Sequence, residues 1–446
     1  MRRLIAAVAL LLTSFSPAHA TEQPLIVMSR NLYLGADVGV ALELIPDFPA
    51  AAQFMWDQVA ATNFSLRAPA LAREVISANA DVVGLQEATN WYCKKNLWSN
   101  KVVVFNFTEQ FLAATKAAGV EYVLARKGEE RSLNIGYSIP AIPYLTMVSD
   151  PRTFQPLFGS NRAACGFEIG DAIAVKKEHA AKILQVGNTE YDASYSIVPK
   201  LMTIYRGYTW VDLEHNGKNV RIISTHLESL WDSNKVPNAA LQAQQLISDT
   251  AQTKMPLIVI GDFNSDPRDP RPDANSNPGG QPEASEECLA QVANPTINSA
   301  IDTCNAYWLM RRAGFIDVGP DATNSKNFTW GMNALLTGPD EMRLKAAQAL
   351  GNQAGFTDRL DYIFLKNGAV AVAASLVGTT PYKEGAWLTD HAGVIAAIDL
   401  PSNQDVSPAL DAHAPFPISF WNWVGIAILT LVAILMKRRR GRKLGS

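Results

Sequence analysis

Short apolar runs rich in branched residues recur along most of the chain, and polar turn-forming residues separate them. Runs of about four to eight such residues are typical of buried β-strands. We predict seven strands from this pattern: Leu25–Met28, Val82–Leu85, Ala172–Val175, Val220–Ser224, Leu257–Ile260, Leu360–Phe364 and Val394–Ile398.

Apolar residues at helical spacing lie between the first two predicted strands. Leu71, Val75 and Ile76 would share one helix face, Pro69 suits the first turn of a helix, and Asn79 suits its end. Because helices and strands alternate only in part, the pattern indicates an α+β fold rather than a simple parallel sheet.

Two stretches differ from this pattern. Asp266–Pro295 is crowded with Pro, Asn, Asp, Gly and Ser, which predicts a long loop. Gly338–Gly351 is rich in Ala after an acidic first turn, which predicts an inserted helix.

The first residues have the layout of a secretory signal peptide. Arg2 and Arg3 precede the apolar run Leu4–Leu12, and Ala18-His19-Ala20 fits a signal peptidase site. An uncleaved anchor is disfavoured because the run is shorter than the roughly 20 residues that span a bilayer. We expect residues 1–20 to be removed and the mature chain to start at Thr21.

The last residues indicate a membrane anchor. Ile418–Met436 has no charged residue, and six basic residues follow it between Lys437 and Lys443. Such clusters stay on the cytoplasmic side of a membrane. We predict a stalk over 401–417, a transmembrane helix over 418–436 and a cytoplasmic tail over 437–446, with the body outside the cytoplasm. A processed sorting tail of the same layout is the alternative.

Composition and charge narrow the function classes. The 446 residues are 48% hydrophobic and 18% charged, which fits one large globular domain over 21–400. The net charge of −3 includes +2 from the leader and +6 from the tail, so the body carries −11. An acidic domain repels polyanions unless its basic residues gather on one face, which counts against a nonspecific nuclease.

All four cysteines fall in the body, where an oxidising compartment lets disulfides persist. Three connectivities are possible. We favour Cys288 with Cys304, which leaves Cys93 with Cys165. Cys-x-x-Cys spacing is absent, so a structural zinc site is not expected.

Polar residues able to bind a metal or phosphate occur where predicted strands begin or end. Strand ends collect active-site residues because the sheet holds the backbone rigid beside an open crevice. These motifs are Ser29-Arg30-Asn31, Gln86-Glu87, Ser224-Thr225-His226, Gly261-Asp262-Phe263-Asn264, Arg359-Leu360-Asp361-Tyr362 and Thr389-Asp390-His391.

In this order the motifs resemble the endonuclease/exonuclease/phosphatase superfamily, which includes pancreatic-type deoxyribonucleases, inositol-polyphosphate 5-phosphatases and neutral sphingomyelinases. The resemblance runs from about Leu25 to Leu400 and includes Asn327–Trp330. It implies a DNase I-like four-layer α/β/β/α sandwich with its site at one rim of the paired sheets. Trp91–Ala164 and the loop after Asn264 depart from the family pattern, which leaves the substrate open.

Phosphoester hydrolysis needs a hard cation, because the negative charge of the phosphate repels an attacking nucleophile. Glu87 and Asn31 suit Mg²⁺, or Mn²⁺ or Ca²⁺, and the resemblance implies that their counterparts hold magnesium directly or through water. Asp390 is a candidate second contact to the metal or its water. Asp171 is a further candidate for substrate binding, on a looser match.

The remaining candidates serve catalysis. Asp262 would orient or deprotonate water, and Asn264 beside it would hold a phosphate oxygen. His391 and His226 could be cationic near neutral pH and stabilise charge developing on phosphorus. The resemblance implies that Asp361 orients His391 through its other ring nitrogen. Each motif alone could be a structural turn or ion pair.

Three functions stay open. A phospholipid or sphingomyelin headgroup phosphodiesterase is favoured by the anchor, the acidic body and the tryptophans near the motifs, which are Trp91, Trp231 and Trp387. An extracytoplasmic nuclease would use Lys94-Lys95 and Arg126-Lys127 to hold phosphates. A non-catalytic binding protein of the same fold is the third. We expect a monomer.

Overall fold

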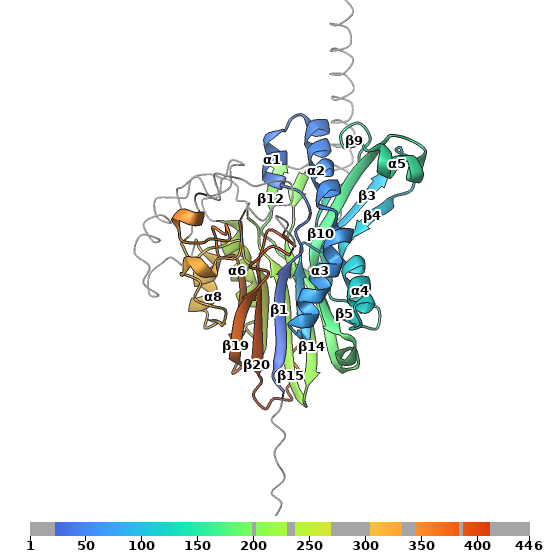
Figure 1. Cartoon of the computed structure of the whole chain (residues 1–446). Coiled ribbons are helices and arrows are strands. Elements are labelled where there is room, and N and C mark those ends of the chain that lie inside the picture. Colours follow the sequence, from blue (N-terminus) through green and yellow to red (C-terminus); the bar gives the residue numbers. More distant parts are fainter. Residues whose placement is uncertain are drawn as a thin grey trace, which may run out of the picture.

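Two β-sheets pack face to face in the computed structural model, and helices cover the outer face of each sheet (Figure 1). The structure describes residues 23–198, 202–229, 237–268, 304–331, 345, 347–382 and 387–410. This arrangement confirms the predicted α+β class and the DNase I-like architecture.

The first sheet has ten strands in the order β19-β20-β1-β2-β10-β3-β4, with β5, β8 and β9 also paired to β10. The pair β1 and β2 is parallel, and both strands run toward the same rim. The strands are β1 (Leu25–Asn31), β2 (Val82–Gln86), β3 (Asn90–Lys94), β4 (Val102–Asn106), β5 (Tyr122–Leu124), β8 (Leu133–Ile139), β9 (Met147–Ser149), β10 (Arg162–Lys176), β19 (Val370–Val377) and β20 (Gly393–Asp399).

The second sheet has six strands in the order β11-β14-β15-β16-β18-β17. They are β11 (Ile183–Glu190), β14 (Gly207–His215), β15 (Lys218–His226), β16 (Leu257–Asp262), β17 (Ile316–Asp317) and β18 (Asp361–Lys366). Two small hairpins join β6 (Arg126–Lys127) to β7 (Glu130–Arg131) and β12 (Tyr195–Val198) to β13 (Met202–Ile204).

Three apolar cores define the four layers. Successive residues of one strand point to opposite faces, so Val27 packs between the sheets while Met28 packs under the helices of the first sheet. Ile222 and Ile223 divide in the same way between the inter-sheet core and the core under α6 and α8. The helices are α1 (Val38–Glu43), α2 (Phe48–Thr62), α3 (Phe64–Ser77), α4 (Phe107–Ala117), α5 (Pro151–Phe158), α6 (Asn238–Asp249) and α8 (Ala306–Arg312), with 3₁₀ turns at Lys177–Lys182 and Ser325–Asn327.

All seven predicted strands are present, but the predicted start of α3 is wrong. The helix begins at Phe64, and Pro69 lies inside it. Phe64 is buried and stacks on Phe107, with ring centroids 3.9 Å apart, which favours the earlier start. Pro69 removes only the hydrogen bond to the Ser65 carbonyl, and both residues lie on the exposed face, where water can replace the missing donor.

A lobe built from β3, β4, β9, α5 and the first half of β10 extends the first sheet (Figure 1). Cys93 and Cys165 face each other across β3 and β10 and form the predicted disulfide. Cys304 is also disulfide-bonded, and its predicted partner Cys288 lies outside the described residues.

Several predictions fall wholly or largely outside the described residues. These are the signal peptide, the transmembrane helix and the basic tail, together with most of the Asp266–Pro295 loop and of the Gly338–Gly351 helix. Of the predicted stalk, residues 401–410 are described and 411–417 are not. Within the described ranges, no helix combines the length and apolar character needed to cross a bilayer.

Candidate active site

The strand registers bring distant motifs to one rim of the sandwich. Asn31 is level with Gln86 on the parallel pair β1 and β2, and His226 is level with Asp262 on the parallel pair β15 and β16. Asp262 in turn faces Asp361 across β16 and β18. These side chains therefore meet because the strands that carry them end, or begin, at the same edge.

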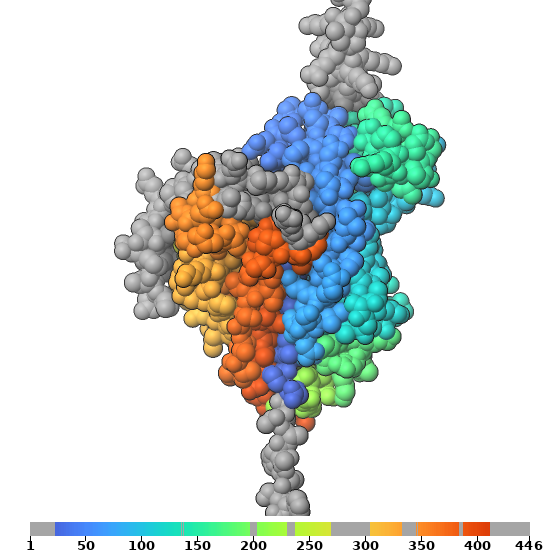
Figure 2. Space-filling model, in the orientation of Figure 1, coloured from blue at the N-terminus to red at the C-terminus, as the bar shows by residue number. Residues whose placement is uncertain are grey.

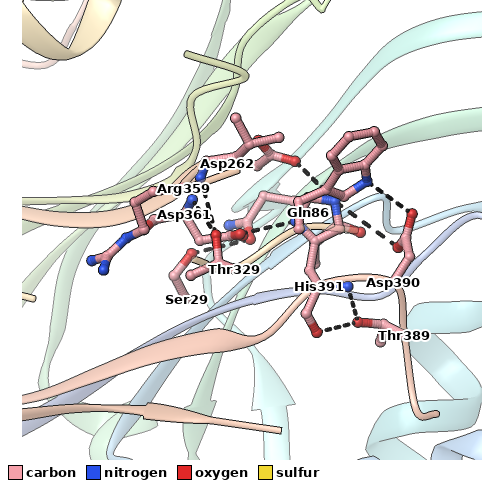
Figure 3. Close-up of polar contacts among 12 residues, drawn as sticks. Ser29, Gln86, Asp262, Thr329, Arg359, Asp361, Thr389, Asp390 and His391 are labelled. Atoms are coloured by element: carbon pink, nitrogen blue, oxygen red, sulfur yellow. Dashed lines mark hydrogen bonds and ion pairs between the residues drawn. The ribbon is translucent and has the colours of Figure 1, made fainter. Parts of the chain in front are cut away.

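Asp262 lies at the centre of the cluster. Its Oδ2 accepts a hydrogen bond from Asn31 Nδ2 at 3.0 Å and lies 3.5 Å from Nε2 of both His226 and His391. A Cβ at Gly261 would lie 2.1 Å from the Thr225 carbonyl oxygen, so glycine is needed where β16 approaches β15. Figure 3 shows Asp262, Asp361 and His391 converging.

His391 is oriented and charged by the carboxylates around it. Its Nδ1 lies 2.9 Å from Asp361 Oδ2, which confirms the predicted contact and turns Nε2 toward Asp262. Burial lowers the pKa of His391, but Asp361, Asp262 and Asp390 outweigh it and raise that pKa to about 10. His391 can therefore present a cationic N–H to the site at neutral pH.

His226 differs from the cation that we expected. Arg206 Nη1 lies 3.1 Å from His226 Nδ1, so this nitrogen must accept rather than carry a proton. Burial, Arg206 and His391 lower the pKa of His226 well below its usual value. Asn264 Nδ2 lies 2.9 Å from His226 Nε2 and donates to the Leu227 carbonyl. His226 is therefore a neutral member of the site.

Arg206 is a site residue that the sequence analysis missed. It lies just before β14, a strand that the apolar pattern did not reveal, and its Nε is 3.2 Å from Glu228 Oε2. Burial lowers the pKa of Arg206, but Glu228, Glu87 and Asp171 outweigh it and raise that pKa. Because β14 itself was not predicted, no signal in the sequence pointed to Arg206.

Glu87, Asn31 and Asp390 offer oxygen ligands that fit a hard cation. Glu87 adopts a left-handed backbone (φ 54°) and its Oε2 accepts from the Leu34 amide, which turns the carboxylate back toward β1. Asp390 Oδ2 accepts from Trp330 Nε1 at 3.2 Å, while its buried Oδ1 lies 3.9 Å from His391 Nε2 and accepts no hydrogen bond. A buried carboxylate oxygen without a hydrogen bond, beside other acids, is a feature that a bound cation would satisfy.

The ligand atoms of a different set, Asp262, Asp361 and His391, lie close enough to one another to hold a metal. The carboxylates around His391 raise its pKa to about 10, however, and a protonated imidazole has no lone pair to offer a metal. Burial raises the pKa of both Asp262 and Asp390, with His391 opposing the rise in each case. A nearby cation would favour their ionised forms.

Asp171 lies inside the site region, as its motif suggested. The carboxyl group is buried, its Oδ1 has no partner, and burial raises its pKa well above the usual value. Asn134 faces it across β8 and β10 and has an unpartnered Nδ2. Tyr33 also has a buried hydroxyl with no partner. Asn134 and Tyr33 are polar groups that no motif indicated.

Two buried arginines hold the loops that carry the site. Arg67 on α3 donates to the carbonyls of Leu32 and Leu388 at 2.7 Å, and also to those of Tyr33 and Thr62. Arg30 on β1 donates to Thr389 Oγ1 at 3.1 Å and to the His391 carbonyl. The loop that carries Asp390 and His391 is thereby fixed to the first sheet.

Two tryptophans proposed to contact lipid are buried instead. Trp91 is 2% exposed and its Nε1 donates to the Leu34 carbonyl, while Trp387 is 8% exposed and packs edge-on against Phe356. Trp231 lies outside the described residues. Arg126-Lys127 also lies away from the site, because Lys127 Nζ donates to the Ile183 carbonyl on β11.

Comparison with solved structures yields distant matches. An endonuclease/exonuclease/phosphatase family protein from Leptotrichia buccalis is 15% identical (TM-score 0.45; 84% of this chain and 99% of that one). TDP2 from D. rerio, solved with a single-strand DNA product, is 14% identical (TM-score 0.42; 84% and 98%). The mannosyl-6-phosphatase of Bacteroides thetaiotaomicron is 15% identical (TM-score 0.40; 84% and 99%).

No curated protein sequence matches the chain. The family comparison is more informative, because residues 59–391 match the Endonuclease/Exonuclease/phosphatase family, and this range covers more than half of the chain. It contains Glu87, His226, Asp262, Asp361 and His391, while Asn31 precedes it. The chain therefore belongs to the Endonuclease/Exonuclease/phosphatase family.

Proposed function

We propose that this protein is a divalent-metal-dependent phosphodiesterase that acts outside the cytoplasm on phospholipid headgroups, with sphingomyelin and phosphatidylcholine as the first substrates to test. The observation that carries the proposed chemistry is the convergence of Asn31, Asp262 and His391, with Asp361 behind the histidine. A general base, a cationic donor and cation ligands at one rim suit attack on a phosphate.

In the proposed reaction Asp262 accepts a proton from water as the water oxygen bonds to phosphorus. The bond to the leaving oxygen breaks, and that oxygen takes up a proton from solvent water to leave as an alcohol. The cationic His391 donates to a phosphoryl oxygen and stabilises the charge that develops there. Arg206 is positively charged and adds to the stabilisation of this developing charge. A divalent cation held by Glu87, Asn31 and Asp390 would neutralise the phosphate.

The lipid substrate is supported by the predicted anchor at 418–436 and by the net charge of −11 on the body. The anchor would keep the site close to a bilayer, and an acidic body disfavours a polyanion such as DNA. Trp91 and Trp387 are buried and therefore do not contribute to lipid contact.

The test uses the purified full chain with sphingomyelin vesicles, phosphatidylcholine vesicles, plasmid DNA and bis-p-nitrophenyl phosphate, each with and without Mg²⁺. We expect magnesium-dependent headgroup release that is absent from Asp262→Asn. Cleavage of DNA alone, with a steep loss of rate as salt rises, would support a nuclease instead. Inactivity on every substrate, with no metal bound, would support the non-catalytic alternative.

A further inference from the structure

The tip of the β3–β4 hairpin presents two large apolar side chains to solvent. Trp98 is 89% exposed, the highest value among the large hydrophobic side chains that the structure describes, and neighbouring Leu97 is 59% exposed. A lone exposed leucine needs no explanation, but a tryptophan exposed at a hairpin tip beside a second apolar side chain does.

The tip does not need these apolar side chains in order to fold. Asn96 Oδ1 accepts from the amides of Trp98 and Ser99 at 3.0 Å, and Ser99 Oγ in turn accepts from the Asn96 amide. The polar residues thus satisfy the backbone of the turn themselves. Leu97 and Trp98 occupy positions where small or polar residues would serve the turn equally well.

Positive charge surrounds the exposed pair. Lys94, Lys95 and Lys101 flank it, and no acidic residue lies between Lys94 and Lys101. Lys101 forms an ion pair with Glu168, whereas Lys95 is exposed. Basic residues around an apolar tip contrast with the acidic body, and they complement anionic headgroups.

The hairpin extends beyond the active-site rim. β3 begins three residues after Glu87, and its ladder with β10 runs from Asn90 opposite Glu168 to Lys94 opposite Ala164. The same β10 carries Asp171 at the site, and the Cys93–Cys165 disulfide ties the two strands together. Figures 1 and 2 show the lobe that carries β3 and β4 at the upper right, away from the β14–β15 turn at the lower end of the molecule.

We propose that Leu97 and Trp98 insert into the interfacial region of an anionic lipid bilayer while Lys94 and Lys95 contact its headgroups. An amphipathic indole favours the headgroup level, and lysine stems can lie along apolar surface while their charges reach phosphates. This inference rests on the proposed function and deepens it. It names the surface that would bring the active-site rim to its lipid substrate.

The test places a fluorophore at the tip. The described residues contain no free thiol, so Trp98→Cys in the full chain accepts an environment-sensitive label, and Val372→Cys, with Val372 56% exposed near the opposite end of the sandwich, is the matched control. In vesicles with phosphatidylserine we expect a blue shift and quenching by spin-labelled lipid at position 98 only. Equal spectra at both positions would overturn the inference. That result is also expected if a protein partner, rather than a membrane, covers the tip.

A second readout uses Leu97→Ser with Trp98→Ser. We expect turnover on anionic vesicles to fall about tenfold and turnover on bis-p-nitrophenyl phosphate to stay unchanged. An equal loss on both substrates, or no loss on vesicles, would contradict the inference. If no lipid is hydrolysed at all, the proposed substrate fails, whereas the fluorescence result still decides whether the tip meets a membrane.

Discussion

Two clusters of acids and a histidine occupy opposite ends of the sandwich, and they use similar residues to different effect. At one end Asp81 Oδ1 lies 2.9 Å from Lys176 Nζ and 3.3 Å from His179 Nε2. Its Oδ2 accepts a hydrogen bond from the Ile26 amide at 2.9 Å. Burial alone would raise the pKa of Asp81, but these hydrogen bonds lower it to about 2. Both oxygens of the Asp81 carboxylate are therefore hydrogen-bonded, and a lysine offsets its charge.

The cluster at the site lacks that balance. Asp262, Asp361 and Asp390 surround one His391, burial raises the pKa of Asp262 and Asp390, and Asp361 Oδ1 and Asp390 Oδ1 accept no hydrogen bond. Both ends could be proposed as metal sites from residue types and spacing alone. The two clusters differ because Lys176 bonds to the carboxylate of Asp81, whereas two carboxylate oxygens at the site accept no hydrogen bond and stay able to bind a cation.

The largest expected difference between the clusters is in activity. Asp262→Asn should lower kcat by about 10³-fold or more, because an amide cannot accept the proton from water. Its thermal stability should not fall, since burial already disfavours the charged carboxylate. Turnover of bis-p-nitrophenyl phosphate and thermal melting check both parts; near-normal turnover would remove Asp262 from its role.

Arg67 should matter through the position of the site loops. Arg67→Lys keeps the charge but cannot reach four carbonyl groups at once, so we expect kcat to fall roughly 10- to 100-fold with a smaller change in KM. Arg73→Lys, on the exposed side of the same helix, is the control and should behave like the unmodified protein. Equal losses in the two variants would show that the helix, rather than the four contacts, is responsible.

The effect of a metal ion on thermal stability should distinguish the two clusters without any assay of activity. Mg²⁺ or Mn²⁺ at about 100 times its Kd should stabilise the protein by about 2.7 kcal/mol, and the melting temperature should rise with metal concentration. Glu87→Gln should abolish that rise, and Asp81→Asn should retain it. Loss of the rise in Asp81→Asn alone would move the metal to the opposite end of the molecule.

Asp81→Asn should in turn reduce stability and leave catalysis alone. Removing the carboxylate leaves the buried Lys176 ammonium with a weaker partner, at a cost of about 1 to 3 kcal/mol in the free energy of unfolding. Urea denaturation measures this cost. A loss of turnover without a loss of stability would contradict the structural role.

The smallest expected effect is a difference between Asp81→Asn and the unmodified protein in how the free energy of unfolding changes at acid pH. Because the pKa of Asp81 is about 2 in the folded chain and about 3.9 when unfolded, its contribution is fully present above pH 4 and is lost as the pH falls toward 2. The Asp81→Asn variant should therefore lose less stability than the unmodified protein across this range. Parallel urea midpoints from pH 5 to pH 2.5 test the sign.

Sequence reasoning located the strands and the motifs that meet at the rim because both have local signals. Val27 and Ile222 belong to apolar runs, and Asp262 and His391 follow or precede such runs directly. The resemblance of the ordered motifs to a known family then supplied the contact between Asp361 and His391, which no local pattern could give.

What the sequence did not reveal depends on distant contacts. Arg206 precedes an unrecognised strand, and only the pairing of β14 with β15 brings it to His226, whose charge it then suppresses. Pro69 resembled a helix start because nothing local shows that Phe64 stacks on Phe107. The burial of Trp91 and Trp387 likewise follows from packing with partners far along the chain.

The 15-residue strand β10 has a consequence for anyone who wishes to redesign this protein. It is shared between the sandwich and the lobe, pairing with β2 near Asp171 and with β3 and β9 farther along. The lobe is therefore not a detachable cassette: a graft that exchanged residues 91–164 would have to preserve the ladder at both junctions, or the carboxylate at the rim would shift together with the transplanted hairpin.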